Sequence, residues 1–247
     1  MRRLRNAVIG MTLAVAVALP GTVAPVPARA DNTQVQVDVA TVIAVAKGLI
    51  DLWKSFQGGG MSIETATRQI LAAIESAKTD IIAHIDRIAA AEARSCATRH
   101  VIELADIERF SPDTLQAWAQ NATACVTLID SLIDAVADKA ASDTLGMALD
   151  VVGPIALIAR SRAGFSTTGL TAVLIRGNNK VLSVLMPECH FAPGWNPPYI
   201  SRSVCIAYNG DRADCSECPP PNDAMRAQAA RRTSWVVAAH VLPALQS

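Results

Sequence analysis

Aromatic residues are scarce in this sequence: Phe, Trp and Tyr make up 4% of its 247 residues, although 51% of the residues are hydrophobic. Few aromatics and many alanines favour closely packed helices and argue against a carbohydrate-binding β-sandwich. An excess of basic residues is absent too, because 22 Lys and Arg balance 22 Asp and Glu. Since nucleic acids are bound through basic surfaces, we expect no nucleic-acid partner.

Catalytic motifs are also absent. The sequence contains no G-x-S-x-G, no H-E-x-x-H and no glycosidase-type pair of carboxylates, and only four histidines can serve acid–base chemistry. We therefore expect a protein without catalysis, cofactor or metal. A secreted hydrolase stays open as a third hypothesis, in which acidic side chains converge on His190 in space. These acidic residues are Asp211, Asp214 and Glu217.

The N-terminus has the pattern of a secretory signal peptide. A basic start at 1–5 precedes an apolar run at 7–19, and small residues follow up to Ala30. We predict a leader over 1–30, cleavage after Ala30 and secretion from a bacterial cell. Removing this leader takes away four arginines and leaves 18 basic against 22 acidic residues. In an oxidising compartment, the six cysteines favour three disulfides.

Glycine and proline are missing between Met61 and Ser111, where apolar residues recur at helical spacing. We predict one long helix from the capping residue Ser62 to the turn at Ser111-Pro112. A second helix should run from Pro112 to about Ala141, folded back on the first. The two helices then form an antiparallel hairpin.

Two cysteines give this hairpin a register. Cys96 lies about fifteen residues before the turn and Cys125 about fourteen after it, so both stand roughly 22 Å from the bend at ~1.5 Å rise per residue. We predict a Cys96–Cys125 disulfide, with nearby alanines allowing the close approach. The same arithmetic places Arg87 opposite Asp134, and we predict an ion pair there.

The flanking segments complete a predicted helical bundle over 31–165. An earlier helix, 31–56, ends at a flexible triglycine joint, and its early Val35/Val37/Val39 alternation also fits a short strand. A later apolar helix, 145–159, is interrupted by one charged residue, Asp150. This helix is predicted to form the centre of the core, and the competing hypothesis is a concealed membrane-inserting segment over 145–185.

The rest of the chain changes in composition. We predict a small β or loop region rich in disulfides over 166–221, followed by a helix over 222–247 that docks on the bundle. Two apolar runs around Gly177-Asn178 have the pattern of a β-hairpin, with two helices as the alternative. A strand is predicted over 200–208, with alternate residues facing inward. These are Val204, Ile206 and Tyr208.

Four cysteines in this region allow three pairings, of which we prefer Cys189–Cys205 with Cys215–Cys218. The C-x-x-C spacing at Cys215 also occurs in redox centres, but the acidic neighbours disfavour a thiolate. A zinc site formed by these cysteines and His190 lacks a second close ligand pair. A structural disulfide is therefore the preferred interpretation.

The histidines on the long hairpin suggest packing and not ligation. His100, Glu103 and Asp106 share a helix face and have metal-ligand chemistry, but the hairpin register places Trp118 opposite them instead of further carboxylates. We predict that His100 is a packing residue. His84 is predicted on the surface, in a polar network with its neighbours Asp80 and Arg87.

The sequence thus predicts a mainly α protein: an antiparallel long-helix hairpin or bundle with a small C-terminal cysteine- and proline-rich subdomain. We expect a secreted, non-catalytic binding or interaction protein whose extracellular partner and oligomeric state are open. The alternative is a membrane-active protein. No residue motif identifies a family; in outline, the long amphipathic helices around the apolar segment 145–185 resemble the helical pore-forming toxins.

Overall fold

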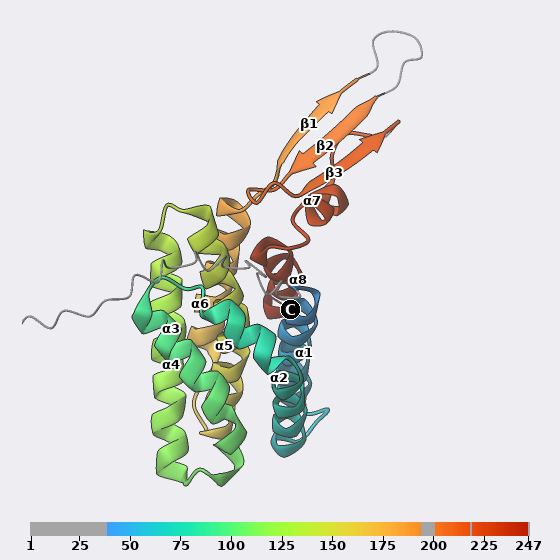
Figure 1. The fold of residues 1–247 in the computed structure, drawn as a ribbon. Helices are drawn as coiled ribbons and strands as arrows, with labels where there is room; N and C mark the ends of the chain where they lie inside the picture. The colour runs from blue at the N-terminus through green and yellow to red at the C-terminus, as the bar shows by residue number, and fades with distance from the viewer. Residues whose placement is uncertain (1–38, 194–200, 218, 247) are drawn as a thin grey trace, which may run out of the picture. The chain divides into compact units, whose positions relative to one another are not determined.

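The structure, a computed structural model, describes residues 39–193, 201–217 and 219–246 of the chain. Helices that run along one another form most of it, and a three-stranded antiparallel sheet lies near the C-terminus (Figure 1). The predicted fold class is therefore confirmed. The predicted leader, residues 1–30, lies outside the described residues.

The long helix predicted from Ser62 is wrong in one respect, because it is broken in two. Ser62 does cap α2 (Ile63–Ile85) by accepting the Thr65 amide at 3.2 Å. The chain then leaves the helix, and α3 (Ala91–Glu103) is followed by a 3₁₀ turn, η1 (Leu104–Arg109). No glycine or proline marks this break. It is made by tertiary packing: Ile88 is buried within it.

The break gives the two halves different partners. α2 packs on α1 (Val39–Gln57), whereas α3 packs on α4 (Pro112–Ala135). Ser111 caps α4 as predicted, accepting the Thr114 amide at 3.2 Å. α4 ends at Ala135 and not near 141, because Asp138 caps a new helix, α5 (Lys139–Arg162). The most extensive helix pair is therefore α4 with α5, and not the two helices on either side of Ser111.

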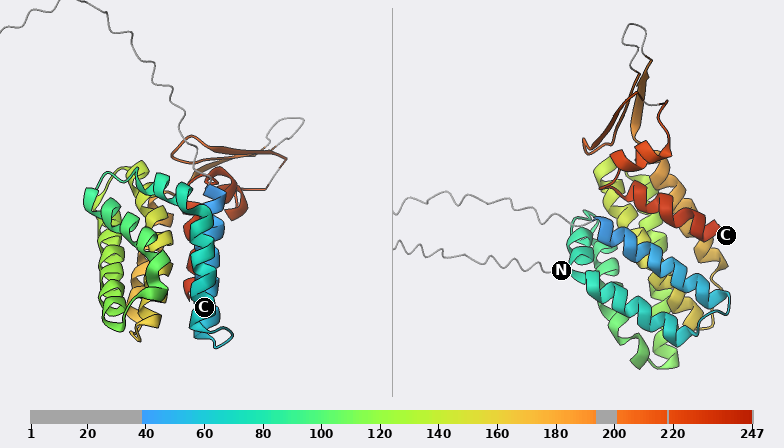
Figure 2. Two further views of the ribbon diagram at one scale, coloured as in Figure 1. Left: turned by 60° about the horizontal axis from the view of Figure 1, so that its bottom comes forward. Right: turned by 90° about the vertical axis from the view of Figure 1, so that its right-hand side faces the viewer.

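α5 forms the centre of the bundle. It contacts α1, α2, α3, α4, α6 and α8, and every residue from Leu145 to Ala159 is buried. Figure 2 shows from two further directions that the helices of the bundle lie side by side. Among the described helices, α5 alone is long and apolar enough to cross a membrane by length and composition. In this fold 89% of its most apolar window is buried, as a core helix requires.

The β-hairpin predicted around Gly177-Asn178 is wrong, since this segment is a helix, α6 (Thr168–Val184). Gly177 provides a close helix contact and not a turn. A Cβ at this position would lie 2.6 Å from Leu149 Cδ2 on α5 and 3.0 Å from Asp130 Oδ1 on α4. Asn178 donates to the Leu174 carbonyl at 2.9 Å within α6. The β region thus begins later than the sequence indicates.

Three strands pair antiparallel in chain order: β1 (Glu188–Ala192), β2 (Arg202–Ile206) and β3 (Arg212–Ser216). The predicted strand around residue 204 is present, but its faces are inverted. Ser203, Cys205 and Ala207 are buried, while Ile206 is 38% exposed. The reason is α7 (Asp223–Ala229), which covers the Cys205 face of the sheet with Ala229 and Met225.

The C-terminal helix predicted from residue 222 is likewise divided. Asn222 caps α7, and the chain turns at 230–233 before α8 (Ser234–Gln246). α8 packs against α1, α5 and α6. Because of this turn, α7 covers the sheet and α8 packs in the bundle. One straight helix could not make both sets of contacts.

Candidate functional site

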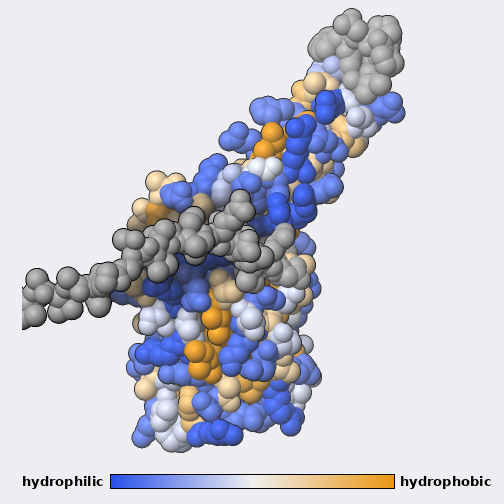
Figure 3. All heavy atoms as spheres, viewed as in Figure 1, coloured by the Kyte–Doolittle hydropathy of each residue, from blue (hydrophilic) through white to orange (hydrophobic). Residues whose placement is uncertain are grey.

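One face of the sheet is left uncovered by α7, and we call it the outer face. Residues paired in register lie on the same face of a sheet, and successive residues of a strand point to opposite faces. The outer face therefore carries the residues on either side of the buried Cys205 along β2 and the residues paired with them. It consists of Glu188, His190 and Ala192 of β1, Arg202, Val204 and Ile206 of β2, and Arg212, Asp214 and Ser216 of β3. Eight of these nine residues are exposed, and Val204 is partly buried. Figure 3 shows apolar residues among hydrophilic ones over the strands.

Charged groups border the apolar centre of the outer face. Arg212 and Arg202 both pair with Asp214, Arg202 at 3.5 Å. The hydrogen bond from Arg212 holds the pKa of Asp214 below its ordinary value. Together with Glu188, two positive and two negative groups surround Val204 and Ile206. The outer face therefore combines an apolar centre with a rim of no net formal charge.

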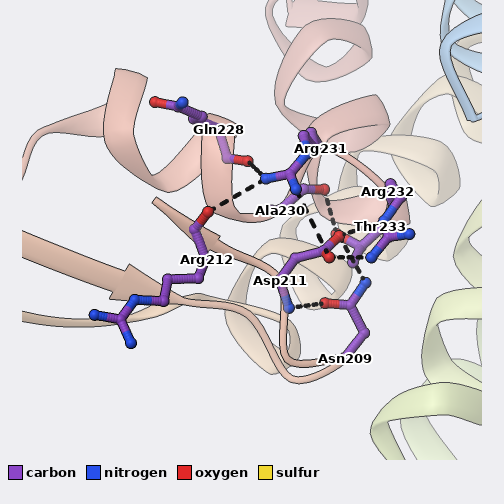
Figure 4. Close-up of polar contacts among 8 residues, drawn as sticks. All are labelled: Asn209, Asp211, Arg212, Gln228, Ala230, Arg231, Arg232 and Thr233. Atoms are coloured by element: carbon purple, nitrogen blue, oxygen red, sulfur yellow. Dashed lines mark hydrogen bonds and ion pairs between the residues drawn. The ribbon is translucent and has the colours of Figure 1, made fainter. Parts of the chain in front are cut away.

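The turn between β2 and β3 is tied to the junction of α7 and α8 through Asp211 (Figure 4). Arg232 donates two hydrogen bonds to the Asp211 carboxylate, and Asn209 donates a third at 3.2 Å. The hydrogen bond from Arg232 is the main cause that lowers the pKa of Asp211. Arg231 extends the network by donating to the carbonyls of Arg212 and Gln228 at 3.3 and 2.9 Å.

A second polar link ties the sheet to the central helix. The Tyr208 hydroxyl, just after β2, donates to Asp143 of α5 at 2.6 Å, and the same carboxylate accepts the Ser234 amide at the start of α8. Asp143 is 7% exposed, and burial raises its pKa. Burial and the Asp143 charge also raise the pKa of Tyr208. These contacts hold the sheet in a fixed position on the helices.

Two of the predicted disulfides are formed. Cys96 and Cys125 join α3 to α4 with Cα atoms 5.7 Å apart, and Cys189 and Cys205 join β1 to β2 at 4.1 Å. Cys215 is also disulfide-bonded, so it offers no thiol for redox chemistry. Its predicted partner, Cys218, lies outside the described residues. These disulfides indicate an oxidising environment.

His100 is a packing residue, as predicted. It is fully buried, its Nδ1 lies 2.7 Å from the Cys96 carbonyl, and its ring contacts Trp118 with 5.3 Å between centroids. Glu103 accepts the Trp118 indole at 2.8 Å, and Asp106 pairs with Arg109 at 3.3 Å. Burial lowers the pKa of His100. No cluster of metal ligands exists among the residues that the structure describes.

Sequence reasoning misplaced one histidine and one ion pair. His84, predicted on the surface, is 6% exposed, and neither ring nitrogen has a hydrogen-bond partner in the described structure. Asp134, predicted to pair with Arg87, pairs with Lys180 of α6 at 3.6 Å instead. Helix periodicity places His84 on the core side of α2, three residues after the buried Ile81 and seven after the buried Ala77, and this signal was available.

Asp150 is a second buried ionisable group, in the middle of α5. Burial raises its pKa to about 8, so the carboxyl is largely protonated at neutral pH. Neither carboxyl oxygen of Asp150 has a hydrogen-bond partner in the described structure. The side-chain oxygen of Asn178 in α6 has none there either. The interaction with Asn178 lowers the pKa of Asp150, but the effect of burial is larger. The signal in the sequence was a single acid within a long apolar run.

Two acids of the hydrolase hypothesis, Asp214 and Asp211, do not meet His190. His190 and Asp214 lie on the outer face in the same row, but Val204 of β2 stands between them, which implies roughly 10 Å for two strand spacings. Asp211 is directed at Arg232 instead. A direct hydrogen bond between His190 and Asp214 is therefore out of reach in this fold.

Two shallow grooves flank α3, with volumes of about 600 and about 520 Å³. Both include Ala91, Ser95 and Arg99, and the second lies over the Cys96–Cys125 disulfide. No protein-family model matches the chain, and neither the curated proteins nor the solved structures contain a match to it.

Proposed function

We propose that this protein is secreted and acts without catalysis, recognising a protein partner through the outer face of its sheet. The leader-like residues 1–30, with cleavage after Ala30, support export, and the disulfides are compatible with an extracellular location.

The observation that carries this proposal is the apolar pair of the exposed Ile206 and the partly buried Val204, on a sheet that is fixed in position. Two polar links and the Cys189–Cys205 disulfide hold the strands, so the outer face loses little conformational freedom on binding. An apolar centre with a polar rim is typical of protein interfaces. The balanced charge of the rim favours a protein over nucleic acid or an anionic membrane, which both require net positive charge.

The test is an interaction experiment with a matched control. A photocrosslinking amino acid at position 206 is used to identify the partner among extracellular proteins, and the partner is then purified and titrated. Ile206→Lys should weaken its binding at least tenfold, whereas Ile102→Lys, at a 48% exposed isoleucine of α3, should not. Equal affinities for the two variants would contradict the proposed surface.

A second candidate function, membrane activity, is favoured by the composition of α5. Its 24 residues would be about 36 Å long, enough to cross the ~30 Å hydrocarbon core. Lys139 lies at one end, while Arg160 and Arg162 lie at the other, as anchors in both headgroup layers require.

Dye-loaded liposomes test this second candidate. Mature protein should release the dye, and the 145–159 segment should become protected from proteolysis by the lipid. Asp150→Lys, which places a permanent charge in α5, should lower the release at least tenfold, whereas Asp51→Lys on α1 should not. Absence of both release and protection would leave the interaction protein as the remaining proposal.

A further inference from the structure

His84 occupies the contact between α2 and the central helix without a polar partner. Its side chain borders a small void of about 10 Å³, and neither ring nitrogen has a hydrogen-bond partner in the described structure. The void is lined by Val42, Ile81, Ile85, Met147, Ala148 and Val151. These walls offer no polar group to a water molecule, so the imidazole is held in an apolar environment.

The charges around His84 provide no counterion for its protonated form. The charge that acts on His84 is Arg87, two residues past the end of α2, and it has the same sign as the protonated imidazole. α1 contributes Val42 to the void, and α5 contributes Met147, Ala148 and Val151, none of which titrates. The nearest acids of α5 are engaged elsewhere. Asp143 accepts from Tyr208 and Ser234, and Asp150 lies against Asn178 of α6.

We propose that His84 is an acid-sensitive switch. Protonation of its imidazole separates α2 from the central helix α5. A buried imidazolium without a counterion is far less stable than a hydrated one, so acid favours any state in which α2 has moved away. This device goes beyond recognition by the outer face and holds whichever of the two candidate functions is correct. It would make α5 accessible selectively in acidic surroundings.

The size of the effect follows from the two protonation states. Burial, with a smaller contribution from Arg87, lowers the pKa of His84 from 6.5 to about 4. The open state regains the ordinary pKa, so the ratio of open to closed molecules rises by up to tenfold per pH unit between 6.5 and about 4. Asp150 does not oppose this local opening, because it stays against α6 when α2 moves.

Amide hydrogen exchange on the full, disulfide-bonded protein tests the proposed switch. Between pH 6.5 and 4.5, and after correction for the intrinsic exchange rate, protection of 77–85 in α2 and 147–151 in α5 should fall by a factor of about 40. Protection in α4 should stay within twofold. His84→Leu should abolish the acid-dependent loss, while His190→Gln, at an exposed histidine of β1, should retain it.

An equal loss of protection in His84→Leu and in the unsubstituted protein would overturn the proposal. If His84→Leu does not fold, an NMR titration of the His84 ring in the unsubstituted protein decides instead. A titration midpoint near 6.5 without loss of α2 protection would also overturn it. A depressed midpoint accompanied by loss of α2 protection would support it.

Discussion

Three of the four buried aspartates in the described structure differ in the partners of their carboxyl groups. Asp211 binds a guanidinium, which lowers its pKa, and stays ionised. Asp143 accepts hydrogen bonds from Tyr208 and an amide, although burial still raises its pKa. Asp150 faces a neutral side chain in an apolar surrounding, and its pKa rises to about 8. Local contacts, and not residue type, thus decide which of the three carries a charge at neutral pH.

The Tyr208 hydroxyl should contribute measurably to stability. Tyr208→Phe removes one of the donors to Asp143, and a buried carboxyl that loses a donor costs about 1–3 kcal/mol. Urea unfolding at pH 7 measures the loss. Ser76→Ala, which removes an exposed hydroxyl bonded to the Ala73 carbonyl, should change the free energy of unfolding by less than about 0.5 kcal/mol. Equal effects of the two substitutions would mean that the Asp143 link stabilises little.

At the scale of helices, two glycines should respond in opposite directions to the same substitution. Gly153 of α5 packs against Leu174 of α6, where a Cβ would collide with the leucine side chain. Gly153→Ala should therefore cost about 1–3 kcal/mol through displaced packing. Gly48, inside α1, has no atom within 4 Å of its added Cβ, so Gly48→Ala should stabilise by up to ~1 kcal/mol. Thermal unfolding of both variants checks the difference in sign.

The Cys96–Cys125 disulfide should determine how firmly α3 is held. Replacing both cysteines by serine frees a loop with a sequence separation of 29, which costs about 3–4 kcal/mol. Amide protection in α3 should fall more than in α1, because α3 packs on α4 across this bridge. The double replacement of Cys189 and Cys205 serves as the control and should leave α3 unchanged. Unaltered α3 protection in the first variant would contradict this role.

For the whole molecule, opposing titrations shape the dependence of stability on pH. Between pH 3.8 and about pH 8, Asp150 is protonated to a greater extent in the native state than in the unfolded chain. The free energy of unfolding therefore rises as the pH falls through 8. His84 acts in the opposite sense between 6.5 and about 4, because there the unfolded chain binds its proton more tightly. The two contributions to global unfolding cancel over that lower range.

Asp150→Asn should therefore expose the histidine contribution. Urea unfolding should show that this variant loses about 1 kcal/mol per pH unit from 6.5 downward, whereas the unsubstituted protein changes little. Above pH 7 the variant should be the more stable of the two. Asp51→Asn, at an exposed carboxylate paired with Lys47, should follow the unsubstituted protein. Parallel profiles for Asp150→Asn and the unsubstituted protein would contradict the assignment.

Much of the local structure was predictable from sequence. Ser62 and Ser111 cap helices as expected, and the arithmetic from Ser111 to Cys96 and Cys125 gave the correct disulfide, because α3 and α4 flank that turn. The candidate site was predictable in part. The strand around Val204 was expected, but which of its faces is exposed depends on where α7 lies, and alternation alone leaves both choices open.

Periodicity and spacing along the chain were sufficient to predict the helical class, the caps at Ser62 and Ser111 and the Cys96–Cys125 disulfide, whereas Cys189–Cys205 was one preferred pairing among three. The positions of the helix breaks and the partners of the buried polar groups depend on tertiary contacts. The break after Ile85 has no glycine or proline, and it places Ile88 in the core. Gly177 resembles a turn residue, yet it allows α6 to approach α5 and α4. Such contacts join segments far apart in the chain, and local patterns do not encode them.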